Sequence, residues 1–134
     1  MIRDDTLNRI GHIAGSCPEV EAAYVFGSFL AREDYRDIDV ALLFSPNMSS
    51  YQAFKLAMKL GSDLFFKIKP GCDFDVRVLN NAHPEFLYEV LRTGINVFSR
   101  NEQDRFDWEA DVLSTYLDLK EMYDAYDREY LARA

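Results

Sequence analysis

The chain has 134 residues, of which 49% are hydrophobic and 28% are charged, a composition typical of globular proteins. Its net charge of −8 argues against a broad nucleic-acid surface, because affinity for phosphates depends on many Lys and Arg contacts. We expect one domain over residues 1–134, with a single core. The sequence has no run of about 18 apolar residues and no apolar signal region at its N-terminus. We therefore expect a cytoplasmic protein without membrane contact.

Two cysteines, Cys17 and Cys72, lie far apart and belong to no Cys-x-x-Cys or Cys/His cluster. Isolated cysteines of this kind indicate neither a disulfide scaffold nor a structural zinc site. We expect both thiols to be buried.

The first half of the chain is predicted to form a helix followed by two strands. Apolar residues recur at helical spacing over residues 5–15. The apolar segment 20–26 ends abruptly at Gly27-Ser28, and the segment 37–44 alternates acidic with aliphatic residues before becoming wholly apolar. We expect two strands here, joined by a short helix or turn.

The second half is predicted to alternate helices with strands. A helix follows serine caps and covers residues 50–64, and alternating hydrophobicity over residues 73–78 predicts a strand with one buried face. A proline suited to the first helical position opens a helix over residues 84–94, and a short apolar strand covers residues 95–98.

The last stretch, from about residue 102 to 131, has one long helical pattern. Its apolar and aromatic positions alternate in steps of four and three, a seam typical of a helix that packs against another helix. Apolar helical stripes usually belong to the chain's own core, although this one also suits a docking surface for a partner. The seam consists of Val112, Tyr116, Leu119, Tyr123, Tyr126 and Tyr130.

Two aspartates at the start of the second predicted strand have the chemistry of a metal site. Residues two apart in a strand point to one face, so Asp37 and Asp39 present their carboxylates side by side while Ile38 enters the core. These negative charges repel each other, and a magnesium ion, which prefers oxygen ligands, removes that cost. Standing alone, an Asp-x-Asp pair is more often the wet face of an edge strand.

The surroundings of the aspartate pair favour metal chemistry. Gly27-Ser28 stands between a strand and an expected helix start, where free N–H groups attract phosphate. Gly27 allows close approach of the backbone, and Ser28 adds a hydroxyl donor. Asp75 completes the carboxylate set if its strand lies beside that of Asp37 and Asp39. Three carboxylates with a phosphate cradle are the elements of a two-metal centre for phosphoryl or nucleotidyl transfer.

These motifs resemble a known family. Residues 24–28 contain the Gly-Ser, residues 36–40 the Asp-x-Asp and residues 74–80 the later Asp of the minimal nucleotidyltransferases of the DNA polymerase beta superfamily. Residues 84–94 and the long C-terminal helix resemble the MNT antitoxins that are paired with HEPN-domain toxins. The resemblance covers roughly residues 5–130.

The resemblance implies a nucleotidyltransferase fold, an α+β (two-layer α/β) structure with a small mixed β-sheet flanked by helices and a long C-terminal helix. It also implies that Asp37, Asp39 and Asp75 hold magnesium, two ions in all, while Gly27 and Ser28 bind the phosphates of ATP. The implied reaction transfers AMP to a tyrosine of a HEPN ribonuclease toxin, releases pyrophosphate and neutralises the toxin.

Departures from the family pattern leave alternatives open. The family usually has Ala-Arg-Gly after Gly-Ser and a longer spacer before Asp-x-Asp, whereas here Arg32 is followed by Glu33, and its role is open. Arg77 shares the face of Asp75 and suits either a substrate contact or an ion pair with Asp73 or Asp75. A small-molecule nucleotidyltransferase of the aminoglycoside type and a non-catalytic antitoxin that neutralises by binding are the alternative functions.

Overall fold

A computed structural model describes residues 2–68 and 72–133 of the chain. The predicted helices and strands are confirmed; α1 begins three residues earlier than expected, and α3 and α5 extend a few residues beyond the expected ends. No helix in these two ranges is long and apolar enough to cross a membrane. In chain order the elements are α1 (Ile2–Gly15), β1 (Val20–Phe26), α2 (Ser28–Ala31), β2 (Asp37–Phe44), α3 (Ser50–Lys67), β3 (Asp73–Val78), α4 (Pro84–Thr93), β4 (Ile95–Ser99) and α5 (Glu102–Arg133).

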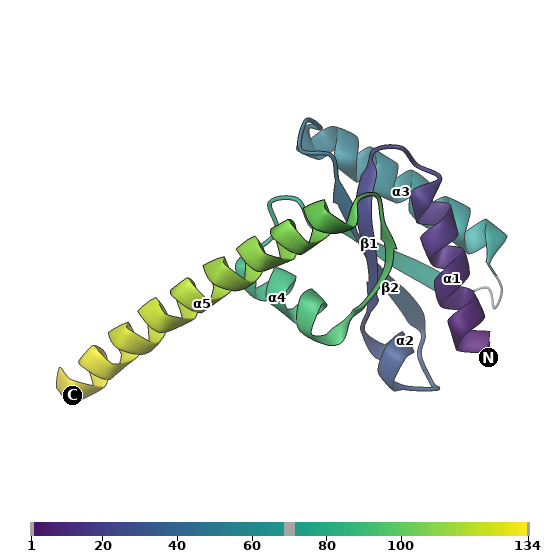
Figure 1. Ribbon diagram of the computed structural model, residues 1–134. Coiled ribbons are helices and arrows are strands. Elements are labelled where there is room, and N and C mark those ends of the chain that lie inside the picture. The colour runs from purple at the N-terminus through teal and green to yellow at the C-terminus, as the bar shows by residue number, and fades with distance from the viewer. Residues whose placement is uncertain (1, 69–71, 134) are drawn as a thin grey trace.

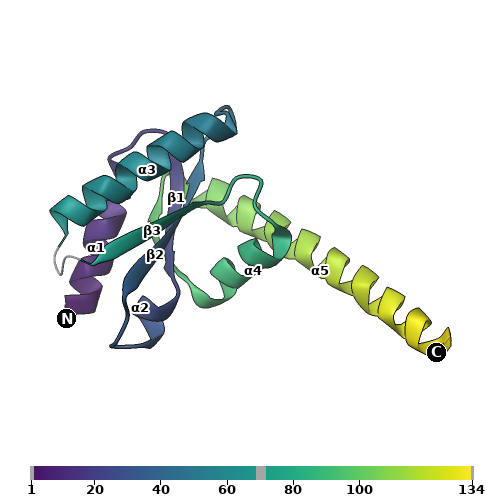
Figure 2. The ribbon, with the colours of Figure 1, turned by 180° about the vertical axis from the view of Figure 1, so that it is seen from behind.

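The strands form one mixed sheet in the order β3-β2-β1-β4 (Figure 1). Strand β1 is antiparallel to both β2 and β4, whereas β2 and β3 run parallel. A parallel pair needs a crossover connection, and α3 provides it. Figure 2 shows β3 beside β2, with α2 at the end of the β1–β2 hairpin. The mixed sheet with flanking helices confirms the predicted fold class.

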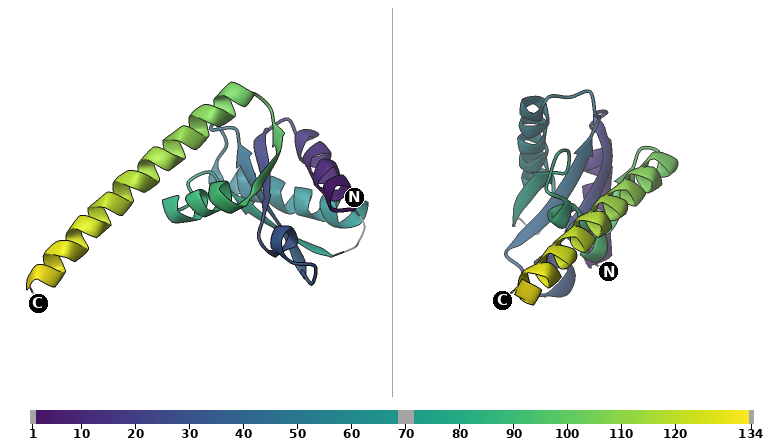
Figure 3. Two further views of the ribbon diagram at one scale, coloured as in Figure 1. Left: turned by 60° about the horizontal axis from the view of Figure 1, so that its bottom comes forward. Right: turned by 90° about the vertical axis from the view of Figure 1, so that its left-hand side faces the viewer.

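The two faces of the sheet pack against different helices. Ile38, Val40 and Leu42 point to the face covered by α1 and α3, where they are almost completely buried in the main core. The other face carries a smaller apolar cluster around Tyr24 and Ala41, covered by α4 and the start of α5. Figure 3 shows α3 and α5 on opposite sides of the sheet. The smaller cluster does not include the first residues of β2, where the aspartates lie.

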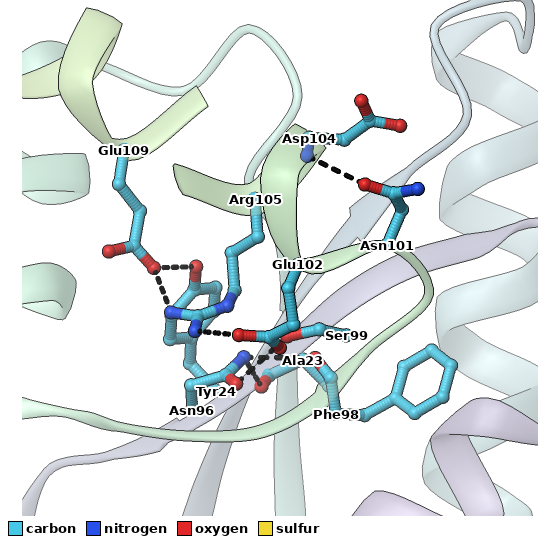
Figure 4. A network of polar contacts seen from close by, with 10 residues as sticks. All are labelled: Ala23, Tyr24, Asn96, Phe98, Ser99, Asn101, Glu102, Asp104, Arg105 and Glu109. Atoms are coloured by element: carbon cyan, nitrogen blue, oxygen red, sulfur yellow. Dashed lines mark hydrogen bonds and ion pairs between the residues drawn. The ribbon is translucent and has the colours of Figure 1, made fainter. Parts of the chain in front are cut away.

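A polar network fixes the start of α5 to the sheet (Figure 4). The Tyr24 hydroxyl donates to Glu109 over 2.6 Å, and Arg105 donates to Glu109 over 2.8 Å and to Glu102 over 2.7 Å. Burial and the neighbouring Glu109 carboxylate raise the pKa of Tyr24, so its hydroxyl remains a proton donor. Asn101 accepts a hydrogen bond from the first turn of α5 and caps the helix.

The predicted seam of α5 packs along only part of its length. Tyr116 stacks on Tyr88 of α4 with ring centroids 3.9 Å apart. Farther along, Tyr123, Tyr126 and Tyr130 are 50%, 68% and 66% exposed. The expectation that the seam belongs to the chain's own core is therefore wrong for its distal half, because α5 continues beyond α4 and the sheet (Figures 1 and 3).

The expectation that both cysteines are buried is also wrong. Cys17 and Cys72 are free thiols with intermediate exposure. Cys17 lies in the turn between α1 and β1, and Cys72 immediately precedes β3. Both flank secondary-structure elements instead of pointing from the centre of one into the core, which explains their partial exposure.

Removal of the Tyr24 hydroxyl tests the anchoring of α5. We expect Tyr24→Phe to lower the free energy of unfolding by about 1–2 kcal/mol, because a buried hydrogen bond to a charged group is lost while Glu109 keeps Arg105. Urea denaturation followed by circular dichroism measures the change. Tyr126→Phe, which removes an exposed hydroxyl, is the control and should leave stability unchanged; equal effects would contradict the anchoring role.

Candidate active site

The sheet register brings two of the three candidate carboxylates to neighbouring positions. Asp39 of β2 lies opposite Phe26 of β1 on one side and Asp75 of β3 on the other. Asp37 is paired in the same way with Asp73. Because side chains alternate along a strand, all four aspartates lie on one face, away from the main core. Asp75 is therefore the aspartate of β3 that adjoins Asp39, and Asp73 lies one step farther out.

Electrostatic repulsion is concentrated on Asp39. Burial raises the pKa of this half-buried carboxyl, and the negative charges of Asp75 and Asp37 raise it further. Arg77 acts in the opposite direction and lowers it. The folded chain thus disfavours the ionised form of Asp39, and a cation placed between the carboxylates would reverse that balance.

Arg77 is held against Asp75 and an aromatic ring. Its guanidinium lies 3.4 Å from the Asp75 carboxylate and 5.9 Å from the centre of the Phe86 ring in α4. Of the two ion pairs open from the sequence, the structure forms the one with Asp75 and not the one with Asp73. The sequence contained no signal for Phe86, because contacts between a strand and a later helix depend on the three-dimensional packing.

Gly27 lies in direct contact with Asp39. Its φ of +83° is a conformation that side-chain-bearing residues rarely adopt. A Cβ atom at this position would lie 2.1 Å from Oδ2 of Asp39, so only glycine fits. Gly27 is the N-cap of α2, and no side chain caps that helix. The first N–H groups of α2, with the Ser28 hydroxyl, therefore stand at the edge of the carboxylate group.

The spacer between α2 and β2 is short and mostly exposed, with Tyr35 as its packed residue. Phe29 and Tyr35 meet edge to face with ring centroids 4.7 Å apart. Arg32 forms a 2.9 Å ion pair with Asp34, and both side chains are largely exposed. Arg32 is thus engaged by its own loop, a local pair that the two-residue spacing in the sequence makes possible. The missing spacer residues do not separate Gly27 from Asp39.

The donor chemistry of the carboxylates suits magnesium. Within residues 2–68 and 72–133, no three His, Cys, Asp or Glu side chains already converge as a metal cage. Magnesium rarely uses such cages, because it keeps several waters and is usually bound by one or two carboxylates plus substrate phosphates. Asp39 and Asp75, with Asp37 adjacent, supply the carboxylates for such a site. A bound cation would also relieve their mutual repulsion.

Solvent reaches the carboxylates, since Asp37 is exposed and the Asp75 side chain is 44% exposed. A cavity of about 620 Å³ lies at the far end of β2, lined by Phe44 and Trp108 among others. A second, of about 360 Å³, lies between α3 and β3 beside Phe54 and Val76. None of the three candidate aspartates lines either cavity. An acceptor would therefore approach the carboxylates over the surface.

Substitution of Gly27 tests its contact with Asp39. We expect Gly27→Ala to lower the free energy of unfolding by about 1–3 kcal/mol, because the methyl group meets Oδ2 and the positive φ becomes strained. Gly61→Ala is the matched control, since its Cβ would lie 3.3 Å from a Val76 methyl and alanine favours the helix. Chemical denaturation measures both, and a neutral Gly27→Ala would contradict the close contact.

The raised pKa of Asp39 leads to a prediction about cation binding. A raised pKa means that the ionised carboxylate opposes folding at neutral pH, so Asp39→Asn should raise the melting temperature when divalent cations are absent. Excess Mg²⁺ should stabilise the wild type and have little effect on the variant. Differential scanning calorimetry measures both, with Asp73→Asn as the control. Equal stabilisation of Asp39→Asn by Mg²⁺ would remove Asp39 from the ligand set.

Several solved structures with a similar fold are toxin–antitoxin complexes. None of the curated proteins matches the chain in sequence. A tri-AMPylated HEPN toxin with its MNT antitoxin from Shewanella oneidensis matches at 23% identity, covering 96% of this chain and 98% of that chain, with a TM-score of 0.67. The toxin–antitoxin MntA-HepT matches at 22% identity with a TM-score of 0.66, covering 96% of this chain and 98% of that chain. A toxin–antitoxin with AMP-PNP matches at 24% identity with a TM-score of 0.69, covering 93% of this chain and 98% of that chain.

The family is shown by a sequence model. The model described as "Polymerase beta, Nucleotidyltransferase" matches residues 8–103, more than half of the 134-residue chain. The matched range contains the Gly27 turn and all three candidate aspartates, so it covers the site as well as the sheet. The chain therefore belongs to the polymerase beta nucleotidyltransferase family.

Proposed function

We propose that this chain is a magnesium-dependent antitoxin that transfers AMP from ATP to a tyrosine of a HEPN-domain toxin in the cytoplasm, and so neutralises it. The observation that carries the proposal is the register of β2 with β3, which sets Asp75 beside Asp39, the aspartate that contacts Gly27. The family supports nucleotidyl transfer. The acceptor is inferred from the similar fold of an antitoxin found with its AMPylated toxin.

The Gly27 turn would hold the triphosphate. No side chain caps the first N–H groups of α2, so a phosphate can bond to them. Helix α2 is a single turn, which limits its dipole, and the individual N–H groups with the Ser28 hydroxyl would provide the contacts. The β and γ phosphates would lie here, with the α phosphorus nearer the carboxylates.

Asp37, Asp39 and Asp75 would hold magnesium, and we propose two ions. When bound, magnesium neutralises phosphate charge and lowers the pKa of a bound hydroxyl. Asp37 is exposed and Asp39 half-buried, so the pair spans the border between solvent and protein. The Arg77 ion pair keeps the Asp75 side chain from turning away into solvent.

AMP transfer joins the acceptor oxygen to the α phosphorus and breaks the bond to the bridging oxygen toward the β phosphate. Pyrophosphate leaves with the electron pair of that bond. The phenolic proton of the acceptor is lost in the same reaction. Asp75 suits either role open to it, ligand or base for this proton, because it lies at the edge of the carboxylate group and its side chain is 44% exposed.

The open site favours a protein acceptor over a small molecule. Small-molecule sites usually enclose most of their ligand in a cleft, and neither described cavity includes the aspartates. A tyrosine on the surface of a docked protein needs no such enclosure, because the partner itself covers the carboxylates. This is the reason to prefer a toxin to an aminoglycoside-like acceptor.

Labelling of the toxin tests the proposed reaction. Purified chain, Mg²⁺ and ATP labelled at the α phosphate should transfer AMP to a HEPN-type toxin, and chelation of Mg²⁺ should abolish transfer. We expect Asp39→Asn and Asp75→Asn to reduce the rate about 100-fold or more, because each removes an oxygen that stabilises developing charge. Mass spectrometry of the labelled toxin identifies the modified tyrosine.

The control is Asp73→Asn, on the same face and strand as Asp75 but beside Asp37. It should retain most of the activity. Toxin neutralisation that survives Asp37→Ala together with Asp39→Ala, without AMP on the toxin, would show a non-catalytic antitoxin. AMP found only on small acceptors would show the aminoglycoside-type alternative.

A further inference from the structure

We propose that the distal half of α5 is the surface on which the partner toxin docks, through a basic helix of that partner. The identity of the partner rests on the proposed function. The surface consists of Tyr123, Tyr126 and Tyr130, together with Met122 at its margin, and is called the distal seam below.

The distal seam continues the pattern that packs α5 onto its own domain. From Val112 onward the seam residues follow steps of four and three without interruption. Val112 is buried and Tyr116 stacks on Tyr88, but the residues of the distal seam are at least 50% exposed. A regular seam of this kind packs against helices, so its continuation predicts a second helix in line with α4.

Within residues 2–68 and 72–133, no other helix covers this region. Helix α5 has 32 residues and α4 has 10. At 1.5 Å per residue these correspond to about 48 Å and about 15 Å, so α4 ends far short of the tip of α5. Figure 1, Figure 2 and the left view of Figure 3 show the distal half of α5 away from the other elements. Helices are held mainly by packing of an apolar face, which this half lacks in the chain alone.

The side chains of the distal seam suit a contact with another protein. Tyrosine and methionine are enriched in protein–protein interfaces, because they combine a large apolar surface with polar or adaptable atoms. Tyr126 and Tyr130 are each about two-thirds exposed, and Met122 is 56% exposed. Three tyrosines spaced along one stripe provide both apolar burial and hydroxyl groups able to bond a polar partner.

Charge favours a basic partner over a second copy of this chain. The exposed half of α5 carries five acidic and three basic residues from position 117 onward, on a chain of net charge −8. Two of the acids, Asp124 and Glu129, pair with basic residues of the same helix. Asp127, next to Tyr126 in the sequence, adds negative charge beside the seam, whereas Asp118 and Glu121 lie farther round the helix. Two copies would bring like charges together, whereas a basic helix would neutralise them.

The position of the distal seam fits the proposed reaction. In Figure 1, α5 descends from the upper end of the sheet to the height of α2, which lies at the lower end, while its tip extends outward from the domain. Gly27, Asp39 and Asp75 lie at that end of the sheet. A protein docked along the distal seam would be held on the same side as the carboxylates, and such tethering raises the effective concentration of its tyrosine at the site.

Removal of the distal seam is the test. The variant carries Tyr123→Ala, Tyr126→Ala and Tyr130→Ala, which favour the helix and keep the net charge. Isothermal titration calorimetry without ATP measures binding to a purified, ribonuclease-inactive HEPN-type toxin. We expect about 100-fold weaker binding than for the wild type. The matched control is Glu121→Ala with Arg128→Ala, which changes the opposite face of the same helix at constant net charge, and it should bind as the wild type does.

The outcomes separate this proposal from the proposed function. If the wild type binds and the seam variant does not, docking by α5 stands even when no AMP is transferred. If the seam variant binds as tightly as the wild type, or the wild type does not bind, docking by α5 is overturned even when AMP transfer occurs. If toxin binding is unchanged by the seam variant, sedimentation velocity of the chain alone shows whether a second copy occupies the distal seam. A dimer that forms with the wild type and not with the seam variant would identify a second copy as the occupant.

Discussion

The parallel pairing of β2 with β3 is the interaction on which both the fold and the site depend. Its register places Val40 beside Val76 on the core face and Asp39 beside Asp75 on the opposite face. A slip of one residue would turn every side chain of β3 to the wrong face, burying Asp75 and exposing its apolar neighbours. The hydrophobic alternation that secures the core therefore also fixes which carboxylates meet.

Repulsion among these carboxylates opposes the same pairing. Asp39 is half-buried between Asp75, Asp37 and the Gly27 turn, and its raised pKa reflects the cost. The buried residues of β2 on the core face, such as Ile38, hold the strand in place despite this charge. Stability and chemistry are thus divided between the two faces of one strand, and the carboxylate repulsion falls on the face opposite the main core.

Periodicity and turn residues allowed the elements and the acidic face to be predicted from the sequence. Asp75, and not Asp73, is also predicted from the sequence, through the family resemblance, but the register that sets it beside Asp39 depends on contacts between strands far apart in the chain. The contact of Gly27 with Asp39 and the placing of Arg77 over Phe86 also arise only from packing. The seam of α5 could be predicted from the sequence. How much of the seam is covered depends on the length of α5 relative to α4, which the sequence pattern did not show.

The rigid start of α5 has a consequence for related chains. Tyr24 and Arg105 fix the first turns of the helix to the sheet. The direction of every later side chain is therefore set by the number of residues that separate it from these turns. Each inserted residue rotates the remainder by about 100°, so one insertion turns the tyrosines away from their original side. Insertions of about seven or eleven residues nearly restore the orientation. If the tyrosines of the distal half of α5 are to point in the same direction, the length of the helix can vary among homologues only in these steps.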